Sequence, residues 1–240
     1  NDLGQLGDGT TTNRKVAIFG ALNGKKVMHL SAGFYHTLVI TSDGKMYGWG
    51  RNGNGQLGDN TTINRKVATF GALSGEKVMH LAAGYNHSLA ITSDGILYGW
   101  GWNAYGQLGD GTKQQRNTSV PVQDPNGDNP TVWQQVTVGN QHTLTINDKG
   151  HVYSWGSNDN GQLGIGTTDS NSHSLPLNIT SLSTTRIIQV VAGGLHSLAL
   201  TFDGQVYAWG YNEYGQLGIN STVRNTPNLT AVMIPPELIG

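Results

Sequence analysis

The chain has no cysteine and few charged residues. None of its 240 residues is a Cys, which excludes a disulfide framework and a thiolate metal site. Charged residues make up 12% of the chain, and the formal net charge at pH 7 is −1. This composition provides no basic field that would attract nucleic acid or an acidic membrane. We therefore expect this segment to bind neither nucleic acid nor a membrane directly.

The sequence also lacks long apolar runs and helical periodicity. No apolar stretch approaches the roughly 18 residues that are needed to span a bilayer. No signal peptide is visible at the N-terminus, although the chain begins in the middle of a repeat. The Asn-x-Ser/Thr sequons lie mostly in turn-like segments, so turn composition explains them better than secretion does. The compartment stays open, with cytoplasm or nucleus favoured.

Glycine is abundant, and much of it belongs to one repeated segment. The chain has 35 glycines, and residues 47–62 read Tyr-Gly-Trp-Gly-Arg-Asn-Gly-Asn-Gly-Gln-Leu-Gly-Asp-Asn-Thr-Thr. This segment returns at 98–112, 153–168 and 207–222, and its second half opens the chain at 1–11. A unit that recurs this often is a structural module before it is a site.

Two short cores mark the repeat. The core Gly-Gln-Leu-Gly begins at Gly4, Gly55, Gly106, Gly161 and Gly215. The core Gly-x-x-His-Ser/Thr-Leu places its histidine at His36, His87, His142 and His196. Each histidine precedes the next Gly-Gln-Leu-Gly by 19 residues, so all variation in length falls roughly in 110–135 and 165–188. We expect an exposed loop that tolerates insertion in that half of the repeat.

Strand signals fill the constant half of the repeat. Residues 36–41 alternate in polarity and end at Asp43-Gly44, after which 45–49 resume, as in a β-hairpin. A further strand is predicted before each hairpin, at 27–31, 78–82, 132–138 and 187–191. Weaker strands are predicted at 15–19 and 66–70. About four strands in each repeat of ~51–55 residues predict an all-β fold, a β-propeller of four-stranded blades.

The repeat also sets the expected organisation of the chain. Counted from Gly-Gln-Leu-Gly, the repeats cover 1–54, 55–105, 106–160 and 161–214, with a partial repeat at 215–240. We interpret the chain as a single propeller segment of about four repeats. Both ends carry the same half of the repeat, so they do not complement each other to close a ring. We expect several blades to lie outside this chain, with a small closed ring as the alternative. Open blade edges would permit self-association.

The complete pattern resembles a known repeat. Asp-Gly-x-x-Tyr-x-Trp-Gly-x-Asn-x-x-Gly-Gln-Leu-Gly, followed by Gly-x-x-His-Ser/Thr-Leu, is similar to the repeat of the regulator of chromosome condensation family. The resemblance covers essentially the whole chain and implies part of a seven-bladed propeller. It implies two possible functions. One is a non-catalytic scaffold for protein interactions, and the other is a guanine nucleotide exchange factor for a Ran-type small GTPase.

The four histidines occupy equivalent places in successive blades, so they surround a ring and do not converge on a metal. The residues alone favour a structural role in which each histidine bonds a neighbouring loop or blade. The resemblance implies instead that these positions contribute to a partner-binding surface. The histidines concerned are His36, His87, His142 and His196.

Acidic residues on the same face would support nucleotide exchange. The resemblance places an acid two residues before Gly-Gln-Leu-Gly, a position that Asp2, Asp159 and Glu213 fill and that Gly53 and Ala104 do not. A second acidic position, directly before the histidine, holds no acid in any repeat. This pattern favours the scaffold. Light-sensing members of the family carry Gly-Trp-Arg-His-Thr, and no repeat here has Trp or Arg before its histidine.

No constellation typical of an enzyme stands out from the repeat. Ser, His and Asp recur in register with it, and no Gly-x-Ser-x-Gly elbow or phosphate-binding loop is present. We therefore predict that the chain is not an enzyme and holds no cofactor or metal. Asp8, Asp59 and Asp110 are expected to cap turns through local backbone amides.

The tryptophans divide into two groups. Four follow the repeat and are expected to pack between blades: Trp49, Trp100, Trp155 and Trp209. Trp133 lies outside the pattern, at the end of the variable segment 113–133 that also contains Arg116. Trp and Arg are frequent interface anchors, so both residues are candidates for binding a partner protein. The alternative is a tolerated insertion with Trp133 packed at the start of a strand.

Overall fold

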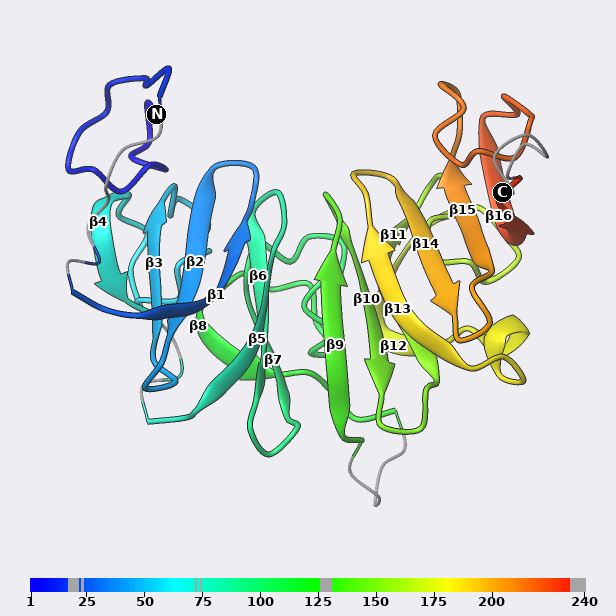
Figure 1. The fold of residues 1–240 in the computed structure, drawn as a ribbon, viewed down its shortest axis with the longest axis horizontal. Coiled ribbons are helices and arrows are strands. Elements are labelled where there is room, and N and C mark those ends of the chain that lie inside the picture. The colour runs from blue at the N-terminus through cyan, green and yellow to red at the C-terminus, as the bar shows by residue number, and fades with distance from the viewer. Residues whose placement is uncertain (17–21, 23, 72, 74, 126–130, 234–240) are drawn as a thin grey trace.

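The computed structural model describes residues 1–16, 22, 24–71, 73, 75–125 and 131–233. The described residues form four antiparallel sheets of four strands each. Within every sheet the strands follow one another in chain order. Figure 1 shows the sheets side by side along the molecule, from blue at one end to orange at the other. We call them blades 1 to 4.

The first two blades have almost identical strand lengths. Blade 1 consists of β1 (Val27–Ala32), β2 (His36–Thr41), β3 (Met46–Gly50) and β4 (Arg65–Phe70). Blade 2 consists of β5 (Val78–Ala83), β6 (His87–Thr92), β7 (Leu97–Gly101) and β8 (Arg116–Pro121). The resemblance in length reflects the equal spacing of the sequence cores in these two repeats.

The last two blades contain the longer repeats. Blade 3 consists of β9 (Trp133–Val138), β10 (His142–Asn147), β11 (Val152–Asn158) and β12 (Asp169–Asn178). Blade 4 consists of β13 (Ile187–Ala192), β14 (His196–Thr201), β15 (Val206–Tyr211) and β16 (Asn225–Ala231). A single 3-10 turn, Thr180–Leu182, connects the two among the described residues. Within the same part of the chain, no helix is long and apolar enough to cross a membrane.

The hydrophobic cores lie between successive blades. One cluster joins Leu38 and Ile40 of blade 1 to Leu81 and Trp100 of blade 2, and two further clusters repeat this arrangement along the chain. The first strands of neighbouring blades pack against one another, β1 on β5, β5 on β9 and β9 on β13. Each sheet therefore buries its faces against its neighbours, as propeller blades do.

The predicted strands agree closely with the observed ones. The four hairpins are confirmed, and the strand before each hairpin begins and ends within one residue of its predicted position. The weak strand predicted at 66–70 is β4, whereas most of the one predicted at 15–19 lies outside the described residues. The variable segments are more than loops, because they contain the fourth strands β8 and β12. The repeats counted from Gly-Gln-Leu-Gly do not coincide with the blades. The reason is that Gly-Gln-Leu-Gly lies between the third and fourth strands of a sheet, whereas each sheet begins with its first strand.

Each blade has two ends with different loops. At one end lie the Gly-x-x-His loop and the loop that contains Gly-Gln-Leu-Gly, and they touch where Arg51 N donates to Tyr35 O at 2.8 Å. We call this end the loop face. At the other end lie the Asp-Gly turns and the connections between blades, which meet where Val78 N donates to Gly44 O at 3.0 Å. We call this end the turn face.

The glycine of Gly-x-x-His is required by a close approach. A Cβ on Gly139 would lie 2.3 Å from Cε1 of His142 and 2.5 Å from the carbonyl oxygen of Gly193 in the next blade. The histidine ring thus packs directly over the glycine, and the backbone of the next blade closes the space from the other side. This explains why the two residue types occur together.

We predict that Gly139→Ala lowers the free energy of unfolding by about 1–3 kcal/mol, because the new methyl group overpacks a closed site. Gly194→Ala is the matched control: the nearest atom to its Cβ is Nδ2 of Asn140 at 3.2 Å, at the end of a movable side chain. Urea unfolding of both variants checks this. Equal stability of the two would show that the close approach has no energetic consequence.

Candidate functional site

The loop that contains Gly-Gln-Leu-Gly fastens one blade to the next. In each repeat the indole Nε1 of a tryptophan on the third strand donates to the main-chain oxygen of a glutamine in the preceding loop, at 2.9 Å. The four pairs are Trp49 with Gln5, Trp100 with Gln56, Trp155 with Gln107 and Trp209 with Gln162. The prediction that these tryptophans pack between blades is confirmed for Trp100, Trp155 and Trp209, which are fully buried.

The same glutamine oxygen accepts a second bond, which brings in the histidine. Ser88 Oγ donates to Gln56 O at 2.8 Å, and Ser197 Oγ donates to Gln162 O at 2.8 Å. Because the serine hydrogen is engaged, His36 Nε2 must donate to Ser88 Oγ (2.8 Å), as His142 Nε2 does to Ser197 Oγ (3.0 Å). For these two histidines the bond to a neighbouring blade is therefore observed.

Three of the four histidines are deeply buried. The exposed fraction is 1% for His36 and 0% for His87 and His142, whereas His196 is half-buried. The pKa of each of the three is lowered to about 3, mainly by burial, with a smaller contribution from His36 and His142 at His87 and from His196 at His142. They are neutral at pH 7, and their side chains do not reach the surface. A contribution to partner binding, as the resemblance implies, would have to pass through the loops that they position.

A buried asparagine closes each loop. Asn52 Oδ1 accepts from Leu57 N at 2.9 Å, and its Nδ2 donates to Asp59 at 2.8 Å. Asn103 makes the same two bonds in the next repeat. The amide thus ties the start of the loop to its end and satisfies a buried main-chain N–H. This role was visible in the sequence only as the recurrent Trp-Gly-x-Asn.

The aspartates after Gly-Gln-Leu-Gly cap turns as predicted. Asp8, Asp59 and Asp110 each accept a bond from the main-chain N of a threonine two residues later. Each also pairs with an arginine six residues later, a contact that the sequence reasoning missed although the spacing recurs three times. The pairs are Arg14 with Asp8 (2.9 Å), Arg65 with Asp59 (2.6 Å) and Arg116 with Asp110 (2.7 Å). Hydrogen bonds from Thr10 and Arg14 lower the pKa of Asp8 to about 2.

The two candidate anchors in the variable segment lie in different surroundings. Arg116 is half-buried and engaged with Asp110. Trp133 is 4% exposed and packs against Tyr153 and Trp155, with ring centroids 5.3 and 6.3 Å away. It lies in the core at the start of β9, as in the alternative given above, and so forms no part of the surface that a partner could contact.

The three candidate acids are exposed but dispersed. Asp2 lies in the N-terminal segment, Asp159 in the loop after β11, and Glu213 in the loop after β15. Asp159 accepts a bond from Ser157 Oγ at 3.1 Å. Glu213 lies 3.7 Å from Arg224. Each acid therefore belongs to a different loop.

Aromatic side chains gather on the loop face of blades 1 and 2. The ring of Phe34 lies 4.5 Å from that of Tyr35 and 4.7 Å from that of Tyr85, and the two tyrosine rings are 5.8 Å apart. The guanidinium of Arg51 lies over Tyr35, 5.4 Å from its centroid. We call Phe34, Tyr35 and Tyr85 the aromatic cluster. The sequence reasoning missed it, although these residues occupy the variable positions just before the histidines.

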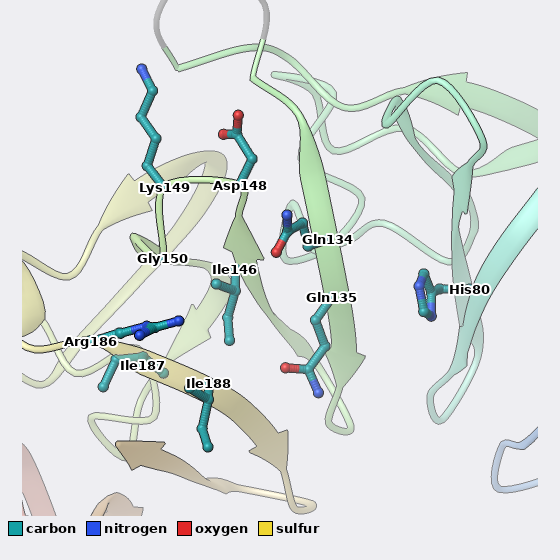
Figure 2. A pocket seen from close by; sticks show the side chains of 10 residues that line it. All are labelled: His80, Gln134, Gln135, Ile146, Asp148, Lys149, Gly150, Arg186, Ile187 and Ile188. Atoms are coloured by element: carbon teal, nitrogen blue, oxygen red, sulfur yellow. The ribbon is translucent and has the colours of Figure 1, made fainter. Parts of the chain in front are cut away.

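A pocket of about 570 Å³ opens on the turn face (Figure 2). It lies where blades 2, 3 and 4 meet, between the start of β9, the turn after β10 and the start of β13. Its polar and charged lining consists of His80, Gln134, Gln135, Asp148, Lys149 and Arg186. Within the part of the chain that the structure describes, no group of three or more His, Asp or Glu side chains could hold a metal ion.

The family model described as the RCC1-like domain matches residues 1–238. The chain belongs to this family. Among proteins of known function, the ultraviolet-B receptor UVR8 of Arabidopsis thaliana is 35% identical over 227 residues, which cover 92% of this chain and 50% of the receptor. The E3 ubiquitin-protein ligase HERC2 of Homo sapiens is 35% identical over 230 residues, or 93% of this chain and 5% of the ligase.

Solved structures of RCC1-like proteins share the fold. Human WBSCR16 superposes with a TM-score of 0.82 at 26% identity and covers 98% of this chain and 61% of its own. Prp20p of Saccharomyces cerevisiae superposes with a TM-score of 0.76 at 24% identity, over 93% of this chain and 53% of its own. The chain thus spans about half the length of UVR8 and of Prp20p. The predicted propeller architecture and family are confirmed.

We predict that Trp155→Phe lowers the free energy of unfolding by about 1–3 kcal/mol, because it removes a buried hydrogen bond and leaves space beside the Gln107 carbonyl. Trp102→Phe is the control, since Trp102 is half-buried and its indole N–H has no acceptor among the described residues. Urea unfolding measures both. A smaller loss for Trp155→Phe than for Trp102→Phe would contradict the importance of this bond.

The buried histidines of this RCC1-like domain predict acid sensitivity. Their pKa is about 3 in the folded chain, against ~6.5 when unfolded, so below pH 6.5 the unfolded chain binds protons that the folded chain does not. Stability should fall by about 1.4 kcal/mol per pH unit for each histidine. Urea midpoints between pH 7.5 and 4.5 measure the slope, and His87→Gln should reduce it. A flat profile would contradict the assignment.

Proposed function

We propose that the chain is a non-catalytic protein-interaction module that contacts its partner through the loop face of blades 1 and 2. The observation that carries the proposal is the aromatic cluster. It supplies large, rigid side chains at a position where the fold does not need them. Aromatic residues are enriched among the side chains that dominate binding energy at protein interfaces.

The aromatic cluster is exposed and departs from the repeat. Phe34 is 60% exposed, and the equivalent residues of blades 3 and 4 are Asn140 and Gly194. Half-buried Trp102 and Tyr105 add a second edge-to-face pair on blade 2, with ring centroids 5.4 Å apart. Since blades 3 and 4 form equivalent four-stranded sheets without aromatic rings at these positions, folding alone does not account for them.

The surface around the aromatic cluster carries the positive charge of Arg51 and lacks the acids of the later blades. Arg51 is stacked on Tyr35, and no carboxylate pairs with it among the described residues. Gly53 and Ala104 stand where the later blades carry Asp159 and Glu213. The partner surface that fits is therefore apolar with an acidic group opposite Arg51.

The solved relatives are described by what they bind, but they do not identify a partner for this chain. One structure shows yeast RCC1 (Prp20) with Kap60, and Prp20p is described by its binding to Gsp1p and histones. These likenesses, at 24% identity, support the shared fold alone. Ultraviolet reception of the UVR8 kind is not part of our proposal, because no repeat of this chain has Trp or Arg directly before its histidine.

Nucleotide exchange on a Ran-type GTPase is the second candidate. The exposed Asp159 and Glu213 on the loop face of blades 3 and 4 favour it, and the missing acids of blades 1 and 2 argue against it. Release of a fluorescent guanine nucleotide from a Ran-type GTPase separates the two candidates. Acceleration by the chain, lost in Asp159→Asn with Glu213→Gln, would replace our proposal by exchange.

We further propose that additional blades complete the ring. Four Gly-Gln-Leu-Gly loops each receive the tryptophan of the blade that follows. The equivalent loop of blade 4 begins at Gly215, which has no neighbouring atom within 4 Å of an added Cβ, and His196 beside it is half-buried. A blade of the same repeat type fits this surface, as the implied seven-bladed ring requires.

A photo-crosslinking amino acid placed at position 34 should capture a partner protein, and the same residue at position 202 should not. Phe202 is the matched control, since it is 64% exposed and follows β14 on the turn face. Tyr85→Ala should reduce the affinity of the captured partner at least about tenfold, equivalent to about 1.4 kcal/mol. Equal capture at both positions would refute the proposed surface.

A further inference from the structure

Two histidines face each other across the boundary between blades 1 and 2. His29 of β1 and His80 of β5 occupy the same position in successive repeats, on the strands that pack against one another. Their ring centroids are 5.9 Å apart and the rings are nearly perpendicular. In both strands the position directly follows a shift in register, a β-bulge that can re-aim a side chain.

The later blades carry glutamine at the same position, and there the contact is different. Gln135 of β9 bonds twice to the main chain of Val190 in the next blade: its Oε1 accepts from Val190 N at 3.0 Å, and its Nε2 donates to Val190 O at 3.3 Å. Neither His29 nor His80 makes a side-chain hydrogen bond to any described residue, and Nδ1 of His29 is buried without a partner. The histidine pair therefore contributes to the boundary through ring packing, whereas the hydrogen bond between the two strands is made by Ala83 N and Ser31 Oγ at 3.0 Å.

The charged groups near the pair do not neutralise it. His80 lines the turn-face pocket, in which Lys149, Arg186 and Asp148 lie on the turn after β10 and at the start of β13 (Figure 2). Among the described residues, no ion pair reaches either histidine. His80 keeps part of its ring exposed, and its partial desolvation, followed by the charge that His29 would carry, lowers its pKa. Two protonated rings at this separation would repel each other.

We propose that the His29–His80 pair is a pH-sensitive contact. When neutral it helps to hold blades 1 and 2 together, and when acid protonates it the packing of β1 against β5 loosens. The contact is specific to this boundary. Blade 3 is joined to blade 4 by the amide of Gln135, which carries no charge at any pH.

The loosened boundary is the one that the aromatic cluster spans. Phe34 and Tyr35 belong to blade 1 and Tyr85 to blade 2, and Phe34 N donates to Gly84 O across the boundary at 3.1 Å. A shift of blade 1 against blade 2 would separate these rings. Acidification would then release the partner, a consequence that rests on the proposed function, whereas the pH-sensitive contact itself does not.

The test uses the whole chain and the residue that the chain itself carries in blades 3 and 4. His29→Gln, His80→Gln and the double variant are compared with the wild type by urea unfolding at pH 7.5 and 5.5. Because the pKa of His80 is lowered on folding, acid favours the unfolded wild type. The unfolding constant of the wild type should rise more between the two pH values than that of the double variant, by up to about tenfold per pKa unit removed.

His151→Gln is the control for loss of a histidine elsewhere, since His151 lies in the turn before β11. The buried histidines of the loop face contribute equally to all these proteins and cancel in the comparison. The two single substitutions should be coupled at pH 7.5, where the neutral rings pack together, and this favourable coupling should shrink or reverse in sign at pH 5.5. Parallel pH profiles of wild type and double variant, or the same coupling at both pH values, would overturn the proposal.

A second measurement does not depend on stability. NMR titration of the histidine ring protons should show the pKa of His80 moving towards its ordinary value in His29→Gln, and an unmoved pKa would overturn the proposal. Partner capture at pH 5.5 then tests the consequence. If the titration and unfolding results hold but capture through position 34 is absent at every pH, the proposed function fails and the pH-sensitive contact stands.

Discussion

One carbonyl oxygen holds each blade to the next. The main-chain oxygen of the glutamine in Gly-Gln-Leu-Gly accepts from the indole N–H of the following blade and from a Ser or Thr hydroxyl beside it, as Gln56 does from Trp100 and Ser88. These groups are buried, so leaving any of them without a partner would cost the full free energy of its desolvation. The tight turn of the loop, the tryptophan and the hydroxyl residue must therefore recur together. The recurrence of these residue types at fixed spacing in the sequence reflects that requirement.

The same requirement limits where function can reside. Side chains that join the blades, such as His36 and Trp155, are buried, and the tryptophan makes the same bond in each repeat. The positions just before each histidine make no such contacts, so they can vary without loss of the fold. Blades 1 and 2 carry Phe34, Tyr35 and Tyr85 there, and these rings are exposed or half-buried. A departure from the repeat at a position the fold leaves free is the strongest sign of a partner in this chain.

Fold and site differed in how far the sequence predicted them. The strands were predictable because alternation and Asp-Gly turns are local signals, and the burial of Trp100 followed from its place in the repeat. Trp133 could not be placed in the same way, because its contacts with Tyr153 and Trp155 arise only when β10 pairs with both β9 and β11. The aromatic cluster escaped notice for a related reason. Tyr85 follows Phe34 by 51 residues in the sequence, and the two rings meet only when blade 2 packs on blade 1.

The histidine pair shows that equivalent contacts in one fold can have different chemistry. His29 and Gln135 occupy the same position after the same bulge, yet one contact can be charged and the other cannot. In a chain with only 12% charged residues, few groups can make a blade boundary respond to its surroundings. His80 of β5 is well suited, because partial desolvation and the neighbouring His29 ring both lower its pKa. Since the boundary it controls is also the one that the aromatic cluster crosses, stability and partner binding would respond to acid through a single contact.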